Sequence, residues 1–195
     1  MSNYARFTIH RTFPELRVAF YLDVDALPIS DLASPIADFA QSGTPLRPTG
    51  RRNMPVSYAF AKEEFNAAYR ERYGVEFDGG APSFNAGVWL ADFTLWEKLD
   101  VDAEALYWVK ANAARVSAGL KPFWELATQP VTYAIFNRDV TGRSTFLERE
   151  WNCDASSKLA DRKVKAGWPP QCKISELLGC DVNFYLTTVV DEDLQ

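Results

Sequence analysis

The sequence predicts an α/β fold, in which short buried strands alternate with helices. Residues 17–22 and 84–91 are short runs rich in apolar and aromatic residues, which is typical of buried strands. Residues 61–73 and 101–118 carry apolar side chains at the three- and four-residue spacing of a helix. The length of 195 residues suits one domain.

The helices have recognisable ends. Asp31 is placed to cap a short helix that runs to Phe39, and Gly74 and Gly119 each follow a helical pattern as a stop. The first long helix is predicted to bury Phe65, Ala68, Tyr69 and Tyr73. The second long helix is predicted to bury Leu106, Val109, Ala113, Val116 and Leu120.

The other segments are less regular. Residues 41–55 and 78–83 are rich in Pro and Gly and are predicted to be loops. Residues 129–137 suggest a further short helix, and residues 183–190 a further strand. Residues 152–181 contain two prolines and two glycines and are predicted to be irregular, with Trp168 exposed.

The composition excludes several classes of function. With 21 Lys and Arg against 26 Asp and Glu, the net charge is −5, so no nucleic-acid partner is expected. No apolar run is long enough to span a bilayer, and the first residues have no apolar core of the signal-peptide kind. We expect a chain with no transmembrane segment. Cytoplasm and, if an upstream anchor is missing, the Golgi lumen both stay open.

Histidine and cysteine usage limits the possible metal sites. The one histidine, His10, rules out a clustered-histidine zinc site and is expected to be a partly exposed helix residue. The three cysteines form no CxxC pair, which excludes a four-thiolate zinc site. Their odd number leaves at least one thiol free or intermolecular, and a local disulfide among Cys153, Cys172 and Cys180 stays open.

Two carboxylates follow directly on the first predicted strand. Alternation along an extended chain places Asp23 and Asp25 on the same side, with Val24 opposite. Like charges repel, so two buried carboxylates need a cation, and their oxygens suit Mg²⁺ or Mn²⁺. The alternative interpretation is a pair of surface aspartates in a turn, because D-x-D is a short and common pattern.

Four sequence blocks, in order, resemble glycosyltransferase family 8. The first is N-Y-A-R-F at residues 3–7, and the second is L-D-V-D followed by D-L at residues 22–25 and 31–32. The third is F-N-A-G-V at residues 84–88, with Trp96 beyond it. The fourth is T-Q-P at residues 128–130 before an apolar segment, with a W-N pair at 151–152.

This resemblance covers roughly residues 2–152 and implies a fold and an activity. The fold is the GT-A, Rossmann-like fold of nucleotide-diphospho-sugar transferases, and we expect a mostly parallel sheet. The activity is transfer of a hexosyl group from a nucleotide sugar, UDP-linked by family default, to a saccharide or other acceptor. Family members retain the anomeric configuration, so the same outcome is implied here.

The resemblance also assigns roles to individual residues. Asp23 and Asp25 would hold Mn²⁺ or Mg²⁺ on the donor diphosphate. Arg6 matches the family arginine that reaches the donor phosphate or sugar, and Gln129 matches the glutamine near the reacting sugar carbon. Along the third block, the donor sugar and acceptor would be lined by Asn85, Ala86 and Gly87.

Several features depart from the family pattern. The carboxylates on either side of the family glutamine are replaced by Thr128 and Pro130, and no histidine follows His10 to act as the late metal ligand. We therefore expect a single family-8-like domain over residues 1–195 that lacks the opening strand-helix portion. Its nucleotide-binding half is expected to be incomplete, and residues 153–195 to diverge.

The departures leave two classes of function open. One is an active, metal-assisted glycosyltransferase. The other is a truncated or degenerate domain without activity that acts as a binding module. A phosphotransferase is disfavoured because the chain has no glycine-rich phosphate loop. A missing front portion would also expose a sheet edge near strand 17–22, so self-association through that edge is expected.

Overall fold

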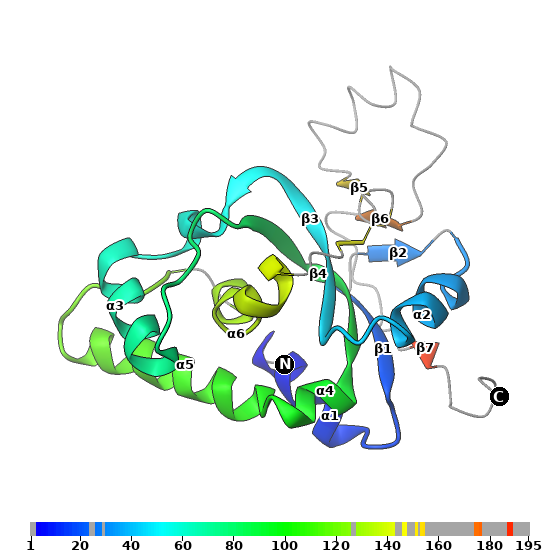
Figure 1. The fold of residues 1–195 in the computed structure, drawn as a ribbon, viewed down its shortest axis with the longest axis horizontal. Helices are drawn as coiled ribbons and strands as arrows, with labels where there is room; N and C mark the ends of the chain where they lie inside the picture. Colours follow the sequence, from blue (N-terminus) through cyan, green and yellow to red (C-terminus); the bar gives the residue numbers. More distant parts are fainter. Residues whose placement is uncertain are drawn as a thin grey trace.

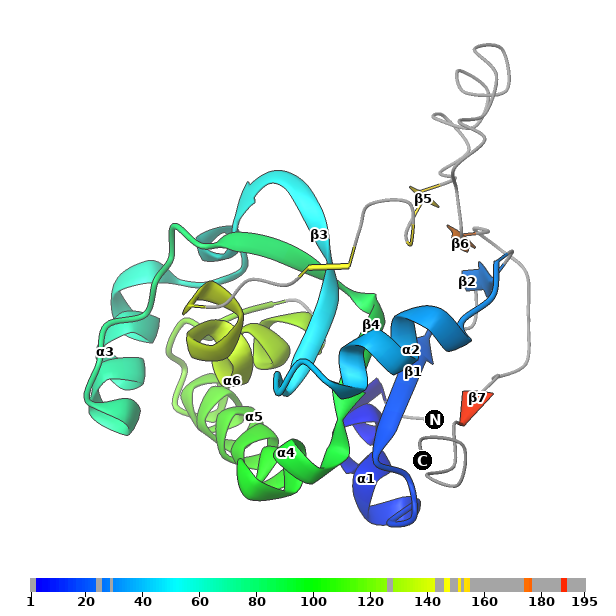
Figure 2. The ribbon, with the colours of Figure 1, turned by 45° about the vertical axis from the view of Figure 1, so that its right-hand side comes forward.

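A computed structural model describes residues 3–23, 26–28, 30–125, 128–142, 146–147, 151, 153–154, 174–176 and 187–188. These residues form an α/β fold built around a four-stranded sheet. Helix α2 (Ala33–Ala40) lies on one side of this sheet, and helices α4 (Phe93–Lys98), α5 (Val101–Ser117) and α6 (Gln129–Gly142) lie on the other (Figures 1 and 2). The predicted α/β class is therefore confirmed.

The order of the main sheet is β3-β4-β1-β7, and each neighbouring pair is antiparallel. Its strands are β1 (Val18–Leu22), β3 (Leu46–Pro55), β4 (Pro82–Asp92) and β7 (Thr187–Thr188). The expected mostly parallel arrangement is wrong for this sheet. The prediction rested on an unbroken apolar run, which indicates that both faces of a strand are buried. Both faces can be buried in a parallel or an antiparallel sheet, so the run does not determine strand direction.

A smaller sheet has the order β2-β6-β5. Strand β2 (Ala26–Pro28) pairs antiparallel with β6 (Ile174–Glu176), which pairs parallel with β5 (Cys153–Asp154). Strand β2 follows β1 closely in the chain, so the two sheets are formed by consecutive strands at this point.

Both faces of strand β1 are covered by apolar core. One face of β1 packs in the core beneath α2, through Val18, Phe20 and Leu22. This core also contains Ile36 and Phe39 of α2. Ala19 and Tyr21 face the larger core on the other side. This alternation explains why all five residues of β1 are buried and why the strand is a continuous apolar run.

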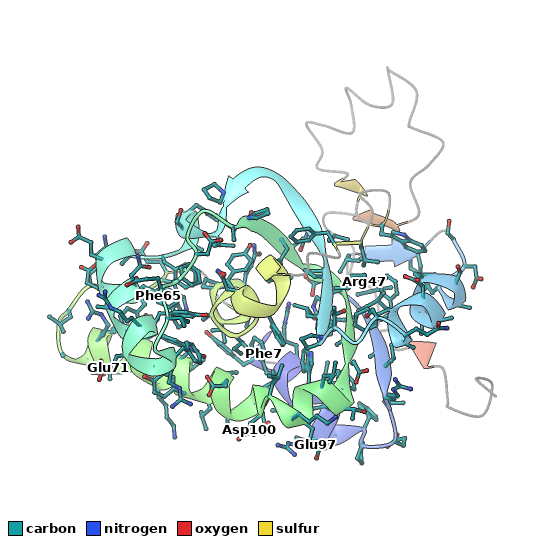
Figure 3. The ribbon with its side chains drawn as sticks, viewed as in Figure 1. Phe7, Arg47, Phe65, Glu71, Glu97 and Asp100 are labelled. Carbon is teal, nitrogen blue, oxygen red and sulfur yellow. The ribbon has the colours of Figure 1, made fainter. Side chains whose placement is uncertain are left out.

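The larger core is dominated by aromatic side chains. Phe65 of α3 (Lys62–Tyr73) stacks on Phe60, and their ring centroids are 3.9 Å apart. Phe65 and Phe7 both lie on the inner side of the helices, whereas Glu71 and Glu97 lie at the periphery (Figure 3). The predicted inner face of α3 is confirmed, because Phe65 and Tyr69 are fully buried, while Ala68 and Tyr73 pack against them.

Strand β3 occupies a segment that the composition predicts to be a loop. Prolines cannot donate hydrogen bonds, but β3 is an edge strand, where that loss is tolerated. Its pairing with β4 shifts register after Pro48 and again after Gly50, so the strand is irregular. The loop prediction failed because pairing with distant β4 supplies the backbone partners that local composition does not reveal.

The predicted helices are present, but the buried face of α5 differs. Helix α5 buries Val101, Ala105 and Trp108, whereas Leu106, Val116 and Leu120 are each more than half exposed. The apolar residues between 106 and 120 form one face of the helix, and Val101, Ala105 and Trp108 form an adjacent face. The aromatic core lies against the second face, so that face is the buried one. Gly119, with φ +71°, follows the helix in the left-handed region, as predicted.

Two further helix predictions hold. The backbone N–H of Ala33 donates a 3.0 Å hydrogen bond to Asp31 Oδ1 at the start of α2. The C-terminal end of α3 is Gly74, with φ +70°. Most of 152–181 and 183–190, Trp168, Cys172 and Cys180 fall outside the described residues, so those predictions stay predictions.

Candidate active site

Asp23 leaves strand β1 directly opposite the F-N-A-G-V segment of strand β4. Leu22 pairs with Val88, and beyond this pair the Asp23 N–H donates a 2.7 Å hydrogen bond to the Gly87 carbonyl oxygen. Antiparallel pairing of β1 and β4 therefore brings Asp23 of the second sequence block against the third block.

Arg6 joins the N-terminal 3-10 helix η1 (Asn3–Thr8) to the same place. Its Nη1 donates a 2.6 Å hydrogen bond to the Ala86 carbonyl oxygen, and its Nη2 lies 3.3 Å from Asp23 Oδ1. The guanidinium carbon also lies 5.0 Å from the centre of the Tyr21 ring. Arg6 is thus a buried cation that holds the first block against β1 and β4.

Tyr21 is a member of this group that the sequence argument missed. Its hydroxyl donates a 2.8 Å hydrogen bond to Asp23 Oδ1, and its ring stacks on Trp89 with a centroid distance of 4.5 Å. Residues i and i+2 share one face of an extended strand, so the spacing of Tyr21 and Asp23 is the signal that would have found it.

Gly87 is required by close approach of side chains. A Cβ at this position would lie 2.6 Å from Asp23 Oδ2 and 3.0 Å from Asn85 Oδ1. Asn85 Oδ1 accepts a 2.6 Å hydrogen bond from the Gly87 N–H, so the amide is held over the glycine. The side-chain oxygens of Asp23 and Asn85 therefore both lie against Gly87, as a shared site requires.

Gln129 reaches the same segment of β4 from the start of helix α6. Its Nε2 donates a 3.0 Å hydrogen bond to the carbonyl oxygen of Phe84, one residue before Asn85. Thr128 and Pro130, which stand at the family's carboxylate positions, are both buried. The structure thus gathers Arg6, Asp23 and Gln129 on residues 84–87.

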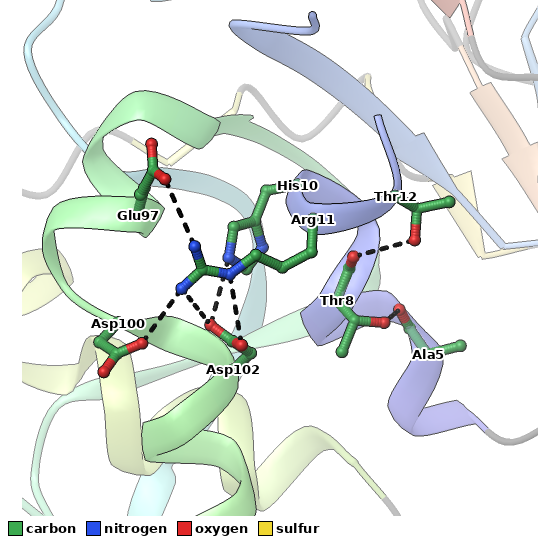
Figure 4. Close-up of polar contacts among 8 residues, drawn as sticks. All are labelled: Ala5, Thr8, His10, Arg11, Thr12, Glu97, Asp100 and Asp102. Carbon is green, nitrogen blue, oxygen red and sulfur yellow. Dashed lines mark hydrogen bonds and ion pairs between the residues drawn. The ribbon is translucent and has the colours of Figure 1, made fainter. Parts of the chain in front are cut away.

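A cluster of charges fixes the short helix that directly follows η1 in the chain (Figure 4). Arg11 of α1 (Ile9–Thr12) lies 3.3 Å from Glu97, 3.3 Å from Asp100 and 3.2 Å from Asp102. Burial raises the pKa of Asp102, but the hydrogen bond and charge of Arg11 outweigh burial and lower it overall. The cluster holds α1, and with it η1, against α4 and α5.

His10 belongs to this structural cluster. It is buried rather than partly exposed, because its ring packs against the rings of Phe93 and Trp96 at centroid distances of 6.1 and 6.0 Å. Its Nε2 lies 3.3 Å from Asp102 Oδ1. The prediction of a helical position is right and the prediction of partial exposure is wrong, because α1 packs that face on α4.

Asp23 is the described residue that could bind a divalent cation. Its Oδ1 is used by Arg6 and Tyr21, while no described residue hydrogen-bonds its Oδ2, which remains available to a cation. No cluster of three His, Cys, Asp or Glu side chains occurs among the described residues, and Asp25 lies outside them. The oxygen donors that are described suit a hard cation, but do not by themselves complete a site.

Sequence comparison identifies the family. The sequence model described as "Glycosyl transferase family 8" matches residues 1–168. The chain belongs to glycosyltransferase family 8. No curated protein matches it. In this family-8 chain the N-Y-A-R-F block, Asp23 of the L-D-V-D block and the F-N-A-G-V block meet at one point of the sheet.

Solved glycosyltransferases share the fold. The galactosyltransferase LgtC, solved with donor and acceptor sugar analogues, has a TM-score of 0.57 at 19% identity, with 90% of this chain and 58% of that chain covered. Mouse xyloside xylosyltransferase 1 gives 0.53 at 16% identity over 93% and 64%. The bifunctional glycosyltransferase WbbM gives 0.58 at 18% identity over 92% and 32%.

This family-8 chain spans 58% of the LgtC chain and 64% of the xylosyltransferase chain. At such identities the likeness shows the GT-A fold alone. It confirms the predicted fold class, with an antiparallel central sheet in the described part. Within that part, no helix is both long and apolar enough to cross a bilayer.

Proposed function

We propose that this chain carries the catalytic region of a retaining, metal-assisted glycosyltransferase. It would transfer a hexosyl group from a UDP-sugar to a saccharide or other acceptor. One observation carries the proposal: Arg6, Asp23 and Gln129, from three different blocks, meet on residues 84–87 of a family-8 chain. Convergence of polar groups at one strand segment is typical of a binding site.

The donor diphosphate would lie near Asp23 and Arg6. Asp23 Oδ2 and Asp25 would hold Mn²⁺ or Mg²⁺, which neutralises charge on the departing diphosphate when bound. Arg6 supplies a buried positive charge in a fixed position, because Ala86 and Asp23 hold its guanidinium. Asn85, Ala86 and Gly87 would line the donor sugar, and the Gln129 amide would lie at its reacting carbon.

The competing proposal is a binding module without catalysis. It is favoured by Thr128, which stands where the family has a carboxylate beside its glutamine, and by the lack of a histidine after His10. We further propose one domain over residues 1–195, with a divergent part at 153–195. The catalytic proposal predicts both donor binding and UDP release, whereas the binding-module proposal predicts donor binding alone.

The experiment uses the whole chain with Mn²⁺ and a panel of UDP-hexoses, and measures both donor binding and UDP release. The expected result is Mn²⁺-dependent binding with UDP release, both at least tenfold weaker in Asp23→Asn. The matched control is Glu71→Gln, which removes one negative charge from an exposed position on α3. Binding without release would support the binding module, and the absence of both would overturn the proposed function.

Self-association through the sheet edge is also proposed. Strand β7 pairs with Ala19 and Phe20 of β1, and within the described part of the chain the other residues on that side of β1 have no strand partner. Sedimentation velocity over a range of protein concentrations tests this proposal. A monomer that persists at every concentration would contradict it.

A further inference from the structure

The side-chain amide nitrogen of Gln129 lies among three hydrogen-bond acceptors. Nε2 lies 3.0 Å from the Phe84 carbonyl oxygen and 3.0 Å from the Tyr58 hydroxyl, and it also contacts the Tyr133 hydroxyl. These contacts come from β4, from the 3-10 helix η2 (Val56–Ala59) and from α6 itself. The glutamine is therefore held from three directions.

The chemistry of Phe84 decides which way the amide points. A backbone carbonyl oxygen only accepts hydrogen bonds, so the Gln129 atom beside it must be the nitrogen. The reverse orientation would place two acceptors 3.0 Å apart. With the nitrogen fixed, Oε1 points away from Phe84, and no described residue hydrogen-bonds it.

Tyr133 is anchored independently of the glutamine. Its hydroxyl donates a 2.6 Å hydrogen bond to the Phe84 carbonyl oxygen, and its ring packs edge-on to the Phe84 ring with a centroid distance of 4.5 Å. The side chain is fully buried. Tyr133 lies four residues after Gln129 in α6, so the two side chains share one face of the helix.

Tyr58 is the more exposed of the two tyrosines that contact the amide. Its ring lies edge-on to that of Tyr133 with a centroid distance of 6.4 Å, and the two hydroxyl oxygens are 3.5 Å apart. About a third of Tyr58 is exposed, with a relative accessibility of 36%. Buried Tyr133 and partly exposed Tyr58 thus both contact the amide nitrogen through their hydroxyl groups.

We propose that Tyr58 and Tyr133 are positioning residues, which hold the Gln129 amide nitrogen against β4 and thereby present Oε1 to the donor sugar. This inference rests on the proposed function. Positive charge develops on the sugar carbon as the diphosphate leaves, and a fixed carbonyl oxygen stabilises that charge, whereas an N–H group would oppose it. Holding the amide before the donor binds removes the cost of reorienting it during the reaction.

The orientation is tested without turnover, by side-chain amide hydrogen exchange of Gln129 in the ¹⁵N-labelled chain. We expect slow exchange in the wild type and exchange at least about fivefold faster in Tyr133→Phe and in Tyr58→Phe, because each variant removes one partner of the amide. Tyr69→Phe is the matched control, since Tyr69 is equally buried in the same core. Fast wild-type exchange, or exchange unchanged in both variants, would overturn the proposal.

The consequence for the reaction is tested separately. In UDP-hexose turnover, each of the two variants should lower kcat about five- to tenfold with little change in the donor KM, while Tyr69→Phe leaves both unchanged. A rise in the donor KM that matches the fall in kcat would overturn the positioning role. So would a fall in kcat no larger than that of Tyr69→Phe. Slow amide exchange in a chain without any turnover would support the held amide and overturn the proposed function instead. Tyr58→Phe keeps the test open if Tyr133→Phe does not fold.

Discussion

Arg6 donates a 2.6 Å hydrogen bond to the carbonyl oxygen of Ala86, 80 residues further along the chain. Trp89 Nε1 donates to the same oxygen at 2.9 Å, so this carbonyl is the point at which the N-terminal helix and strand β4 meet. The guanidinium also touches Asp23. Arg6 therefore both stabilises the fold and sets the charge beside the candidate metal ligand.

We expect Arg6→Ala to lower the free energy of unfolding by about 2–3 kcal/mol, because hydrogen bonds to a buried charge are lost. Solvent screens the ion pair with Asp23, which is about one-third exposed, so this pair adds little to the loss. Arg70→Ala is the control, because Arg70 forms a solvent-exposed ion pair with Glu76 and its loss should cost less than about 1 kcal/mol. Urea denaturation measures both, and equal losses would contradict the structural role of Arg6.

Gly87→Ala should displace the Asp23 carboxylate. The added Cβ would lie 2.6 Å from Oδ2, and Arg6 and Tyr21 limit how far the carboxylate can move. We expect a loss of about 1–3 kcal/mol in stability together with weaker Mn²⁺ binding. Gly50→Ala, whose Cβ would lie 3.5 Å from Phe146, is the control in the same sheet. Wild-type Mn²⁺ affinity in Gly87→Ala would argue against a site at Asp23.

Isothermal titration should detect weak Mn²⁺ binding that Asp25→Ala abolishes. Two carboxylates without a histidine leave more positions to water, so the affinity should be below that of a three-ligand site. Glu63→Ala removes an exposed carboxylate in the first turn of α3 and should leave binding unchanged. Unchanged Mn²⁺ uptake by Asp25→Ala would reject the site.

Stability should decline at high pH through Tyr73. Burial and the hydrogen bond from its hydroxyl to Glu104 raise the pKa of Tyr73 well above its usual value of about 10. Above about pH 10 the unfolded chain releases this proton while the folded chain keeps it, so the free energy of unfolding falls. Below that pH the contribution is fully present.

Tyr73→Phe should therefore show a shallower alkaline decline, by at most about 1.4 kcal/mol per pH unit. Urea denaturation at several pH values between about 8 and about 11 measures the difference. Tyr107→Phe removes a partly exposed tyrosine hydroxyl from α5 and serves as the comparison. Identical pH profiles for wild type and Tyr73→Phe would show that this hydroxyl is not held as described.

The sequence by itself determined the α/β class and the family. It also placed Asp23 at the end of a strand, because an apolar run followed by L-D-V-D is visible without any distant contact. Gly74 and Gly119 were predictable helix ends for the same reason. The strand end and the two helix ends each depend on residues within one or two turns of each other, and local spacing records them.

Only the tertiary structure decided strand direction, strand β3 and the buried face of α5. Burial on both faces makes β1 apolar whichever way its partners run, and the partners of β3 lie more than 25 residues away on β4. Two of the three partners of Gln129 were equally invisible, since Phe84 and Tyr58 are 45 and 71 residues from it. Local composition reports which residues avoid water, whereas pairing between distant segments depends on how the whole core packs around its aromatic side chains.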